Sequence, residues 1–147
     1  MAIMSPLYPR GPVDVSSHVQ PLPQDGSVPD LPAWRWIHTP GHTDGHVSFF
    51  RDEDHTMLVG DAFCTTQAES VLAVATQRPE LHGPPAYYTS NWDEAKRSVE
   101  KLAALQPNTV APGHGLPMTG TDVRQGLELL AANFDSVARP KHGRYAA

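Results

Sequence analysis

Three short corners constrain how this chain folds, because each places a histidine or an aspartate after an apolar, strand-like run. The first corner spans 38–46 and reads His-Thr-Pro-Gly-His-Thr-Asp-Gly-His. The second, Gly-Asp-Ala-Phe, spans 60–63, and the third, Ala-Pro-Gly-His-Gly, spans 111–115. Glycine or proline interrupts regular structure in each corner, so a turn there can direct the polar side chain toward a common point. The pattern therefore predicts strand ends that meet at one metal-competent centre.

The runs between the corners predict both strands and helices. Bulky and β-branched residues indicate four strands, at 34–38, 46–50, 56–59 and 109–111. Apolar residues spaced three and four apart indicate two helices, one capped by Ser90 or Asn91 that reaches Leu105, and one capped by Thr121 that reaches Val137. A shorter helix is expected within 69–77. This order predicts an α/β fold in which helices cover one face of a sheet.

The N-terminal segment differs in character from the rest of the chain. Residues 1–33 contain seven of the 15 prolines and show no helical periodicity. We expect only a short strand at 19–22 and a turn at Asp25-Gly26 in this segment. The sequence thus predicts an irregular, proline-rich segment at 1–33, a partial domain at 34–139 and a tail at 140–147.

The charge balance and the single cysteine indicate which binding partners and which cellular location to expect. Eleven Lys and Arg against 16 Asp and Glu give a formal net charge of −5, which argues against nucleic-acid binding. No run approaches the roughly 18 apolar residues of a membrane span, and the first residues do not resemble a signal peptide. Cys64 is the only cysteine, so no intrachain disulfide is possible and the cytoplasm is the expected location. Beside Phe63, this thiol is expected in the core.

His42, Asp61 and His114 are the candidate metal ligands. His42 and His46 lie four residues apart, but the proline and glycines around them exclude a helix, so His42 is expected at a loop tip and His46 at the start of the next strand. Imidazole and carboxylate groups suit zinc, or iron or manganese where oxygen ligands dominate. Taken singly, a lone histidine is more often a surface or core residue than a ligand, and Gly-Asp after a strand is often an ordinary turn. Their joint occurrence favours the metal site.

The segment Thr-Pro-Gly-His-Thr-x-Gly-His, together with the two later corners, resembles the C-terminal half of metallo-β-lactamase-fold hydrolases. This superfamily includes glyoxalase II-type thioesterases and acyl-homoserine lactonases, and the resemblance runs from about Trp34 to about Val137. It implies one half of a four-layered αββα sandwich with the site at one edge of the two sheets.

The resemblance also implies roles for individual residues. His42 resembles the ligand of the family's third motif, Asp61 the aspartate that bridges both metals and takes part in catalysis, and His114 the final ligand of the second metal. His46 would orient the loop from behind the ligands. Up to two zinc ions, or iron or manganese, would then polarise a carbonyl and hold a hydroxide that attacks a thioester, lactone or related ester of small-molecule size.

The chain departs from the family pattern in one important respect. The family carries His-x-His-x-Asp-His in its N-terminal half, and this sequence contains no such motif; His18 is the only histidine before His38. We therefore expect a truncated protein, in which Met1 corresponds to an internal methionine of a longer ancestor. An incomplete site predicts weak metal binding and little hydrolysis by this chain alone.

Two hypotheses on function follow, and the sequence leaves both open. The chain is either a metal-dependent hydrolase that came from, or is completed by, further protein, or a non-catalytic remnant that serves as an interaction module. In the second case an exposed, apolar sheet face would favour self-association.

Residues other than the ligands bear on the substrate. Cys64 stands three residues after Asp61, where the lactonases usually carry tyrosine, and this disfavours a lactone substrate. Four aromatic residues are candidates for a substrate pocket, although aromatic side chains more often pack in cores: Tyr87, Tyr88, Trp92 and Tyr145.

Overall fold

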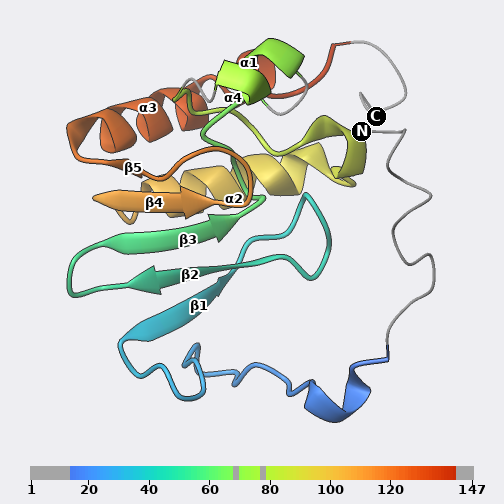
Figure 1. Ribbon diagram of the computed structural model, residues 1–147, viewed down its shortest axis with the longest axis vertical. Coiled ribbons are helices and arrows are strands. Elements are labelled where there is room, and N and C mark those ends of the chain that lie inside the picture. The colour runs from blue at the N-terminus through green and yellow to red at the C-terminus, as the bar shows by residue number, and fades with distance from the viewer. Residues whose placement is uncertain (1–13, 68–69, 77–78, 142–147) are drawn as a thin grey trace.

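The computed structural model describes residues 14–67, 70–76 and 79–141 and centres on a five-stranded sheet (Figure 1). The strands lie side by side in chain order: β1 (Trp34–His38), β2 (Val47–Arg51), β3 (Thr56–Gly60), β4 (Thr109–Pro112) and β5 (Met118–Thr119). The helices are α1 (Val71–Thr76), α2 (Trp92–Ala103), α3 (Thr121–Ala132) and α4 (Phe134–Val137), with 3-10 turns η2 (Ser16–His18) and η3 (Ala86–Tyr88). The four predicted strands and the expected α/β class are confirmed.

The topology of the sheet brings the three sequence corners to one edge. Strands β3 and β4 pair in parallel, so their carboxyl ends, which lead to Asp61 and His114, lie next to each other. Strand β2 is antiparallel to both β1 and β3, so the loop between β1 and β2, with His42, leaves the sheet at this same edge. Neighbouring strand ends therefore present all three corners together.

The two long helices follow local sequence signals. Asn91 caps α2, since its side chain accepts a hydrogen bond from the Glu94 N–H at 3.1 Å. The cap predicted for Thr121 is wrong: Gly120 is the N-cap of α3, with no side-chain hydrogen bond, and Thr121 is the first helical residue. The predicted run to Val137 is also interrupted, because α3 ends before Asn133 and α4 begins at Phe134.

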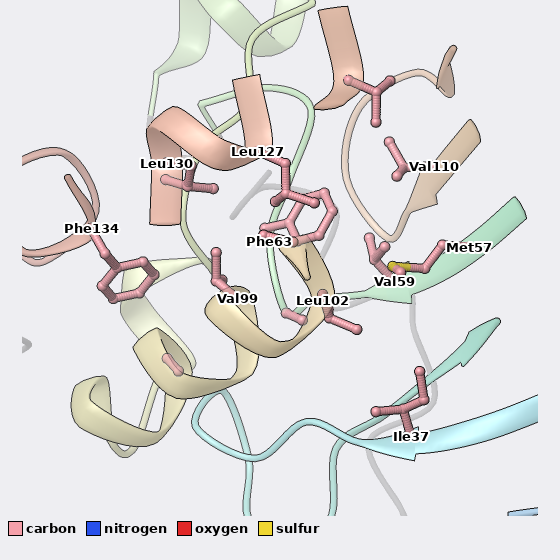
Figure 2. Close-up of a cluster of buried hydrophobic side chains, with 14 of the residues drawn as sticks. Ile37, Met57, Val59, Phe63, Val99, Leu102, Val110, Leu127, Leu130 and Phe134 are labelled. Atoms are coloured by element: carbon pink, nitrogen blue, oxygen red, sulfur yellow. The ribbon is translucent and has the colours of Figure 1, made fainter. Parts of the chain in front are cut away.

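One hydrophobic core lies between the sheet and the helices. Strand side chains face helix side chains there (Figure 2): Ile37, Met57, Val59 and Val110 come from strands, and Val99, Leu102, Leu127 and Leu130 from helices. Phe63, which follows the second corner, is completely buried among them. Cys64 is buried too, as predicted. The core therefore holds the segment after Asp61 firmly against the helices.

The opposite face of the sheet carries a row of apolar residues. Strand pairing aligns Trp36, Phe49, Leu58 and Ala111 in one row across four strands. Leu58 is 41% exposed, whereas its chain neighbours Met57 and Val59 are buried on the helix side. The strands of a sheet with one solvated face normally alternate apolar and polar residues. Apolar residues on both faces are therefore typical of a sheet that is packed against other protein layers on both faces.

The segment before β1 is irregular but attached. Residues 19–22 form no strand, so that prediction is wrong, whereas the turn at Asp25-Gly26 is confirmed. The Trp36 indole N–H donates to the Pro23 carbonyl at 2.7 Å, and the Trp36 backbone N–H donates to the Gly26 carbonyl at 2.8 Å. These two bonds hold the segment against β1.

In the part of the chain that the structure describes, every helix is too short or too polar to cross a bilayer.

The two glycines of the loop between β1 and β2 provide a test of the fold. A Cβ at Gly41 would lie 2.2 Å from the Ala95 backbone nitrogen, and Gly41 has a φ of +129°. A Cβ at Gly45 would meet nothing within 4 Å. We expect Gly41→Ala to lower the free energy of unfolding by about 2 kcal/mol or more, and Gly45→Ala to change it by less than about 0.5 kcal/mol. Urea denaturation measures both, and equal effects would contradict the docking of this loop on α2.

Candidate metal centre

Asp61 lies between the two candidate histidines. His42 Nε2 is 3.5 Å from Asp61 Oδ2, and His114 Nε2 is 3.7 Å from Asp61 Oδ1. Each carboxylate oxygen thus faces a different imidazole. The structure brings together all three residues that the sequence singles out, with the aspartate in the middle.

Helix α2 fixes the loop that carries His42. The backbone N–H groups of Ser90 and Asn91 donate to the Gly41 carbonyl at 3.0 and 2.9 Å. From the next turns of the helix, the Ser98 hydroxyl donates to the Pro40 carbonyl at 2.7 Å. The absence of a side chain at Gly41 allows this close approach. His42 is therefore held by a helix that begins about fifty residues later in the chain.

Thr89 determines which nitrogen His42 presents. The Thr89 hydroxyl donates to the Pro85 carbonyl at 2.8 Å, so it accepts from His42 Nδ1 at 3.3 Å. The proton of a neutral His42 ring then lies on Nδ1, and the Nε2 lone pair points toward Asp61. A backing hydrogen bond of this kind is the usual arrangement behind a metal-binding histidine. No local sequence pattern marks Thr89, which follows η3.

The Asp61 carboxylate lacks a conventional hydrogen-bond partner on one oxygen. Asp61 Oδ1 is buried and forms no hydrogen bond within the described part of the chain. A Cβ at Gly113 would lie 2.4 Å from this atom, so glycine keeps the space beside the carboxylate open. The Gly113 N–H donates to the Gly60 carbonyl at 2.8 Å, which ties the third corner to the second. A buried oxygen without a donor is costly unless a cation or water satisfies it.

His114 lies on the solvent side of the centre. Its carbonyl accepts from the Thr65 N–H at 3.1 Å, and the following Gly115 has a φ of +100°, which favours glycine. The His114 side chain is 46% exposed, compared with 10% for His42. The centre is therefore closed on the α2 side and exposed on the His114 side.

Burial favours the neutral form of the His42 ring. Removal from water lowers the pKa of His42, while the negative Asp61 raises it and His114 lowers it further, and burial is the largest of these effects. Burial likewise lowers the pKa of His46. A neutral ring retains the Nε2 lone pair that metal binding requires.

The distances favour a cation over a direct ion pair. At 3.5 and 3.7 Å, the imidazole nitrogens are too far from the carboxylate oxygens for good hydrogen bonds. Two ligand atoms about 2.1 Å from one tetrahedral metal lie about 3.4 Å apart, which is close to both separations. The donor set and the orphan oxygen fit metal binding at Asp61.

The described residues alone do not complete such a site. Within the described ranges, no three His, Cys, Asp or Glu side chains are grouped so that they could hold a metal ion. The pairwise distances and this result agree, since Asp61 forms one pair with His42 and a separate pair with His114. Each pair supplies two protein ligands, fewer than the three of a typical catalytic zinc site.

The sequence also singles out His46 and four aromatic residues. His46 Nε2 accepts from the Asp61 backbone N–H at 2.9 Å, so this nitrogen is already used by the backbone. Trp92 is buried against Phe134, so of the two alternatives for this aromatic residue the structure favours packing in the core. Tyr87 and Tyr88 stack edge to face on the surface just before Thr89, and Tyr145 lies outside the described residues.

Comparison with known proteins agrees with this geometry. The family model described as the metallo-beta-lactamase superfamily matches residues 1–114, a range that includes the proline-rich segment. The chain is 50% identical over 137 residues to the "Probable metallo-hydrolase YflN" of Bacillus subtilis (strain 168), a match that covers 93% of this chain and 52% of the relative.

Solved structures show the same fold. The metallo-beta-lactamase family protein TTHA1429 from Thermus thermophilus is 28% identical, with a TM-score of 0.52 over 85% of this chain and 41% of that chain. The BLEG-1 B3 metallo-beta-lactamase is 20% identical, with a TM-score of 0.50 over 67% of this chain and 42% of that chain. The second likeness concerns the fold alone.

The chain spans about half the length of the YflN relative from Bacillus subtilis. Within that span, the family match covers the His42 and Asp61 corners and ends at His114. The sheet, the converging corners and the family match together lead to one conclusion: this chain belongs to the metallo-beta-lactamase superfamily.

Proposed function

We propose that this chain provides part of the active site of a metal-dependent hydrolase that cleaves thioesters or related esters. The observation that carries the proposal is the Asp61 carboxylate, whose two oxygens face His42 and His114 at 3.5 and 3.7 Å. The relative named a probable metallo-hydrolase, of which this chain covers 52%, supports the same reaction class. Zinc is the cation we propose first, because imidazole and carboxylate ligands suit it, with iron or manganese as alternatives.

The residues of the chain have separate tasks in this proposal. His42 and His114 would each hold a cation through Nε2, and Asp61 would offer one oxygen to each position. Such cations supply Lewis acidity toward a carbonyl oxygen and activate water as a nucleophile at neutral pH. Thr89 keeps the proton of His42 on Nδ1, and the exposed side of His114 leaves room for a small-molecule ester.

In this proposal the chain corresponds to the C-terminal sheet-and-helix half of an αββα sandwich. Support comes from the coverage of only 52% of the relative and from the apolar row Trp36, Phe49, Leu58 and Ala111 on the face away from the helices. A second sheet packed on this face would stand beside the same edge that holds Asp61. It would be placed to supply the missing ligands.

The residue at position 64 narrows the ester substrates that we propose, compared with those of the family as a whole. Cys64 follows Asp61 by three residues and is fully buried, so this position offers no hydroxyl to a substrate at the site. We therefore propose thioesters and simple esters ahead of lactones, for which the lactonase branch usually has a tyrosine at this place.

A second candidate function is a non-catalytic interaction module. It is favoured by the finding that no three ligands are grouped in the described part of the chain, together with the apolar row around Leu58. In this case the same face would associate with a second copy of the chain, because two identical apolar faces are complementary in polarity.

Metal binding and hydrolysis test the first proposal together. We expect Asp61→Asn, His42→Ala and His114→Ala each to weaken zinc binding at least about tenfold, since each removes a ligand. His18→Ala, a change in an exposed histidine of η2, is the matched control and should bind zinc as the wild type does. Competition with a chromophoric chelator measures affinity, and thioester hydrolysis with added zinc measures activity. Full zinc occupancy without turnover of any thioester or ester would reject catalysis by this chain.

Gly113 offers a test that avoids backbone strain. Its φ lies outside the left-handed region, but an added Cβ would lie 2.4 Å from Asp61 Oδ1. We expect Gly113→Ala to reduce zinc affinity about tenfold or more, because the methyl group displaces the carboxylate. The thermal midpoint of the metal-free protein should change much less than in Gly115→Ala, where the added Cβ would meet Thr65. Unchanged zinc affinity in Gly113→Ala would contradict the role of Asp61.

Self-association separates the second candidate from the first. If the row around Leu58 joins two copies, the wild type should dimerise with increasing concentration, and Leu58→Lys should be monomeric. Leu129→Lys is the control, because Leu129 is 64% exposed on α3, a helix on the other side of the sheet. Analytical ultracentrifugation gives the result, and a monomeric wild type at high concentration would exclude this contact.

A further inference from the structure

The ring of His46 joins two backbone segments through its two nitrogens. Its Nε2 accepts from the Asp61 backbone N–H at 2.9 Å. Its Nδ1 lies 2.8 Å from the Thr39 hydroxyl and 3.1 Å from the Thr39 carbonyl. Because a backbone N–H can only donate and a carbonyl can only accept, the ring must carry its proton on Nδ1 and leave Nε2 bare.

Two buried hydroxyls extend this connection. The Ser48 hydroxyl donates to the Val59 carbonyl at 3.1 Å, so its oxygen must accept from the Thr39 hydroxyl, 3.0 Å away. The Thr39 oxygen in turn accepts from His46 Nδ1. Every proton in the chain of bonds is thereby assigned, from the Asp61 N–H through His46, Thr39 and Ser48 to the Val59 carbonyl.

These hydrogen bonds close into a loop around the turn at Gly60, which we call the hydrogen-bond ring. Val59 and Asp61 flank Gly60, the last residue of β3, which has a φ of +56° and lies where the pairing with β4 shifts register. A Cβ at Gly60 would lie 2.6 Å from His46 Nε2, so the imidazole packs directly on the glycine. Thr39 and Ser48 are 1% and 0% exposed, so water does not compete for their hydroxyls. A turn at glycine has wide conformational freedom, and the hydrogen-bond ring restricts that freedom.

We propose that Thr39, His46 and Ser48 are positioning residues that fix the turn at Gly60 and so aim both Asp61 oxygens at the two histidines. The inference rests on the proposed metal-binding function but concerns different residues, none of which is a proposed metal ligand. The competing explanation is that the ring merely satisfies buried polar groups. In that case its loss would lower stability without a selective effect on Asp61.

Two substitutions of His46 separate these explanations. In His46→Gln the side-chain carbonyl reaches the place of Nε2 and can accept from the Asp61 N–H, but the bond to Thr39 is lost. In His46→Asn the amide occupies the place of Nδ1, can donate to the Thr39 carbonyl and leaves the Asp61 N–H without a partner. The two variants each lose one side of the ring, so a general loss of stability should affect both similarly.

The readouts are hydrogen exchange of the Asp61 backbone amide, zinc affinity by chelator competition, and urea denaturation of the metal-free protein. We expect His46→Gln to keep amide protection and to bind zinc within about threefold of the wild type. His46→Asn should lose amide protection and bind zinc about 10- to 100-fold more weakly at a similar urea midpoint, the effect typical of residues behind metal ligands. Equal zinc affinity and equal amide exchange in the two variants would overturn the proposal.

A second pair of variants applies if His46→Asn does not fold. Ser48→Ala opens the ring, whereas Ser98→Ala removes a buried hydroxyl that donates to the Pro40 carbonyl outside the ring. We expect faster exchange of the Asp61 amide in Ser48→Ala only. The same change in both variants would overturn the positioning role.

A metal-independent measurement distinguishes failure of this inference from failure of the proposed function. Imidazole nitrogen shifts of the wild type should show His46 protonated on Nδ1 and bare on Nε2 at neutral pH. If the wild type binds no zinc but shows this tautomer and a protected Asp61 amide, the metal function is rejected. The hydrogen-bond ring around Gly60 is then still supported. The opposite tautomer of His46 would contradict the proposed hydrogen-bond ring, whatever the zinc affinity of the protein.

Discussion

The turn at Gly60 is the constraint on which the site depends. Its carbonyl accepts from Gly113, which brings the third corner beside Asp61, and its missing side chain makes room for His46. The parallel pairing of β3 and β4 places these corners at one edge, and burial of Phe63 holds the chain that follows. A single glycine with a φ of +56° therefore connects the sheet, the aspartate and both histidine loops.

The convergence of the corners could be predicted from the sequence because it depends on local signals. Glycine and proline end each strand, and strand ends that share an edge must meet, so His42, Asp61 and His114 could be grouped before any geometry was known. Strand β1 and the cap of α2 at Asn91 were predictable for the same reason. Their roles as metal ligands stay predictions, supported by the distances and by the family.

The remaining features depend on contacts between distant segments. Thr89 backs His42 from 47 residues away, and Gly113 leaves space for a carboxylate 52 residues earlier, neither of which periodicity can reveal. Strand β5 has only two residues and pairs because β4 offers an open edge. Residues 19–22 have strand-like composition, but no strand pairs with them within the described ranges, which explains the failed prediction.

The most direct test of the central claim is the anomalous scattering of zinc in crystals of the chain. The account predicts zinc density within about 2.2 Å of an Asp61 oxygen and of Nε2 of His42 or His114. Density at other residues only, with the Asp61 carboxylate turned away from both imidazoles, would contradict it.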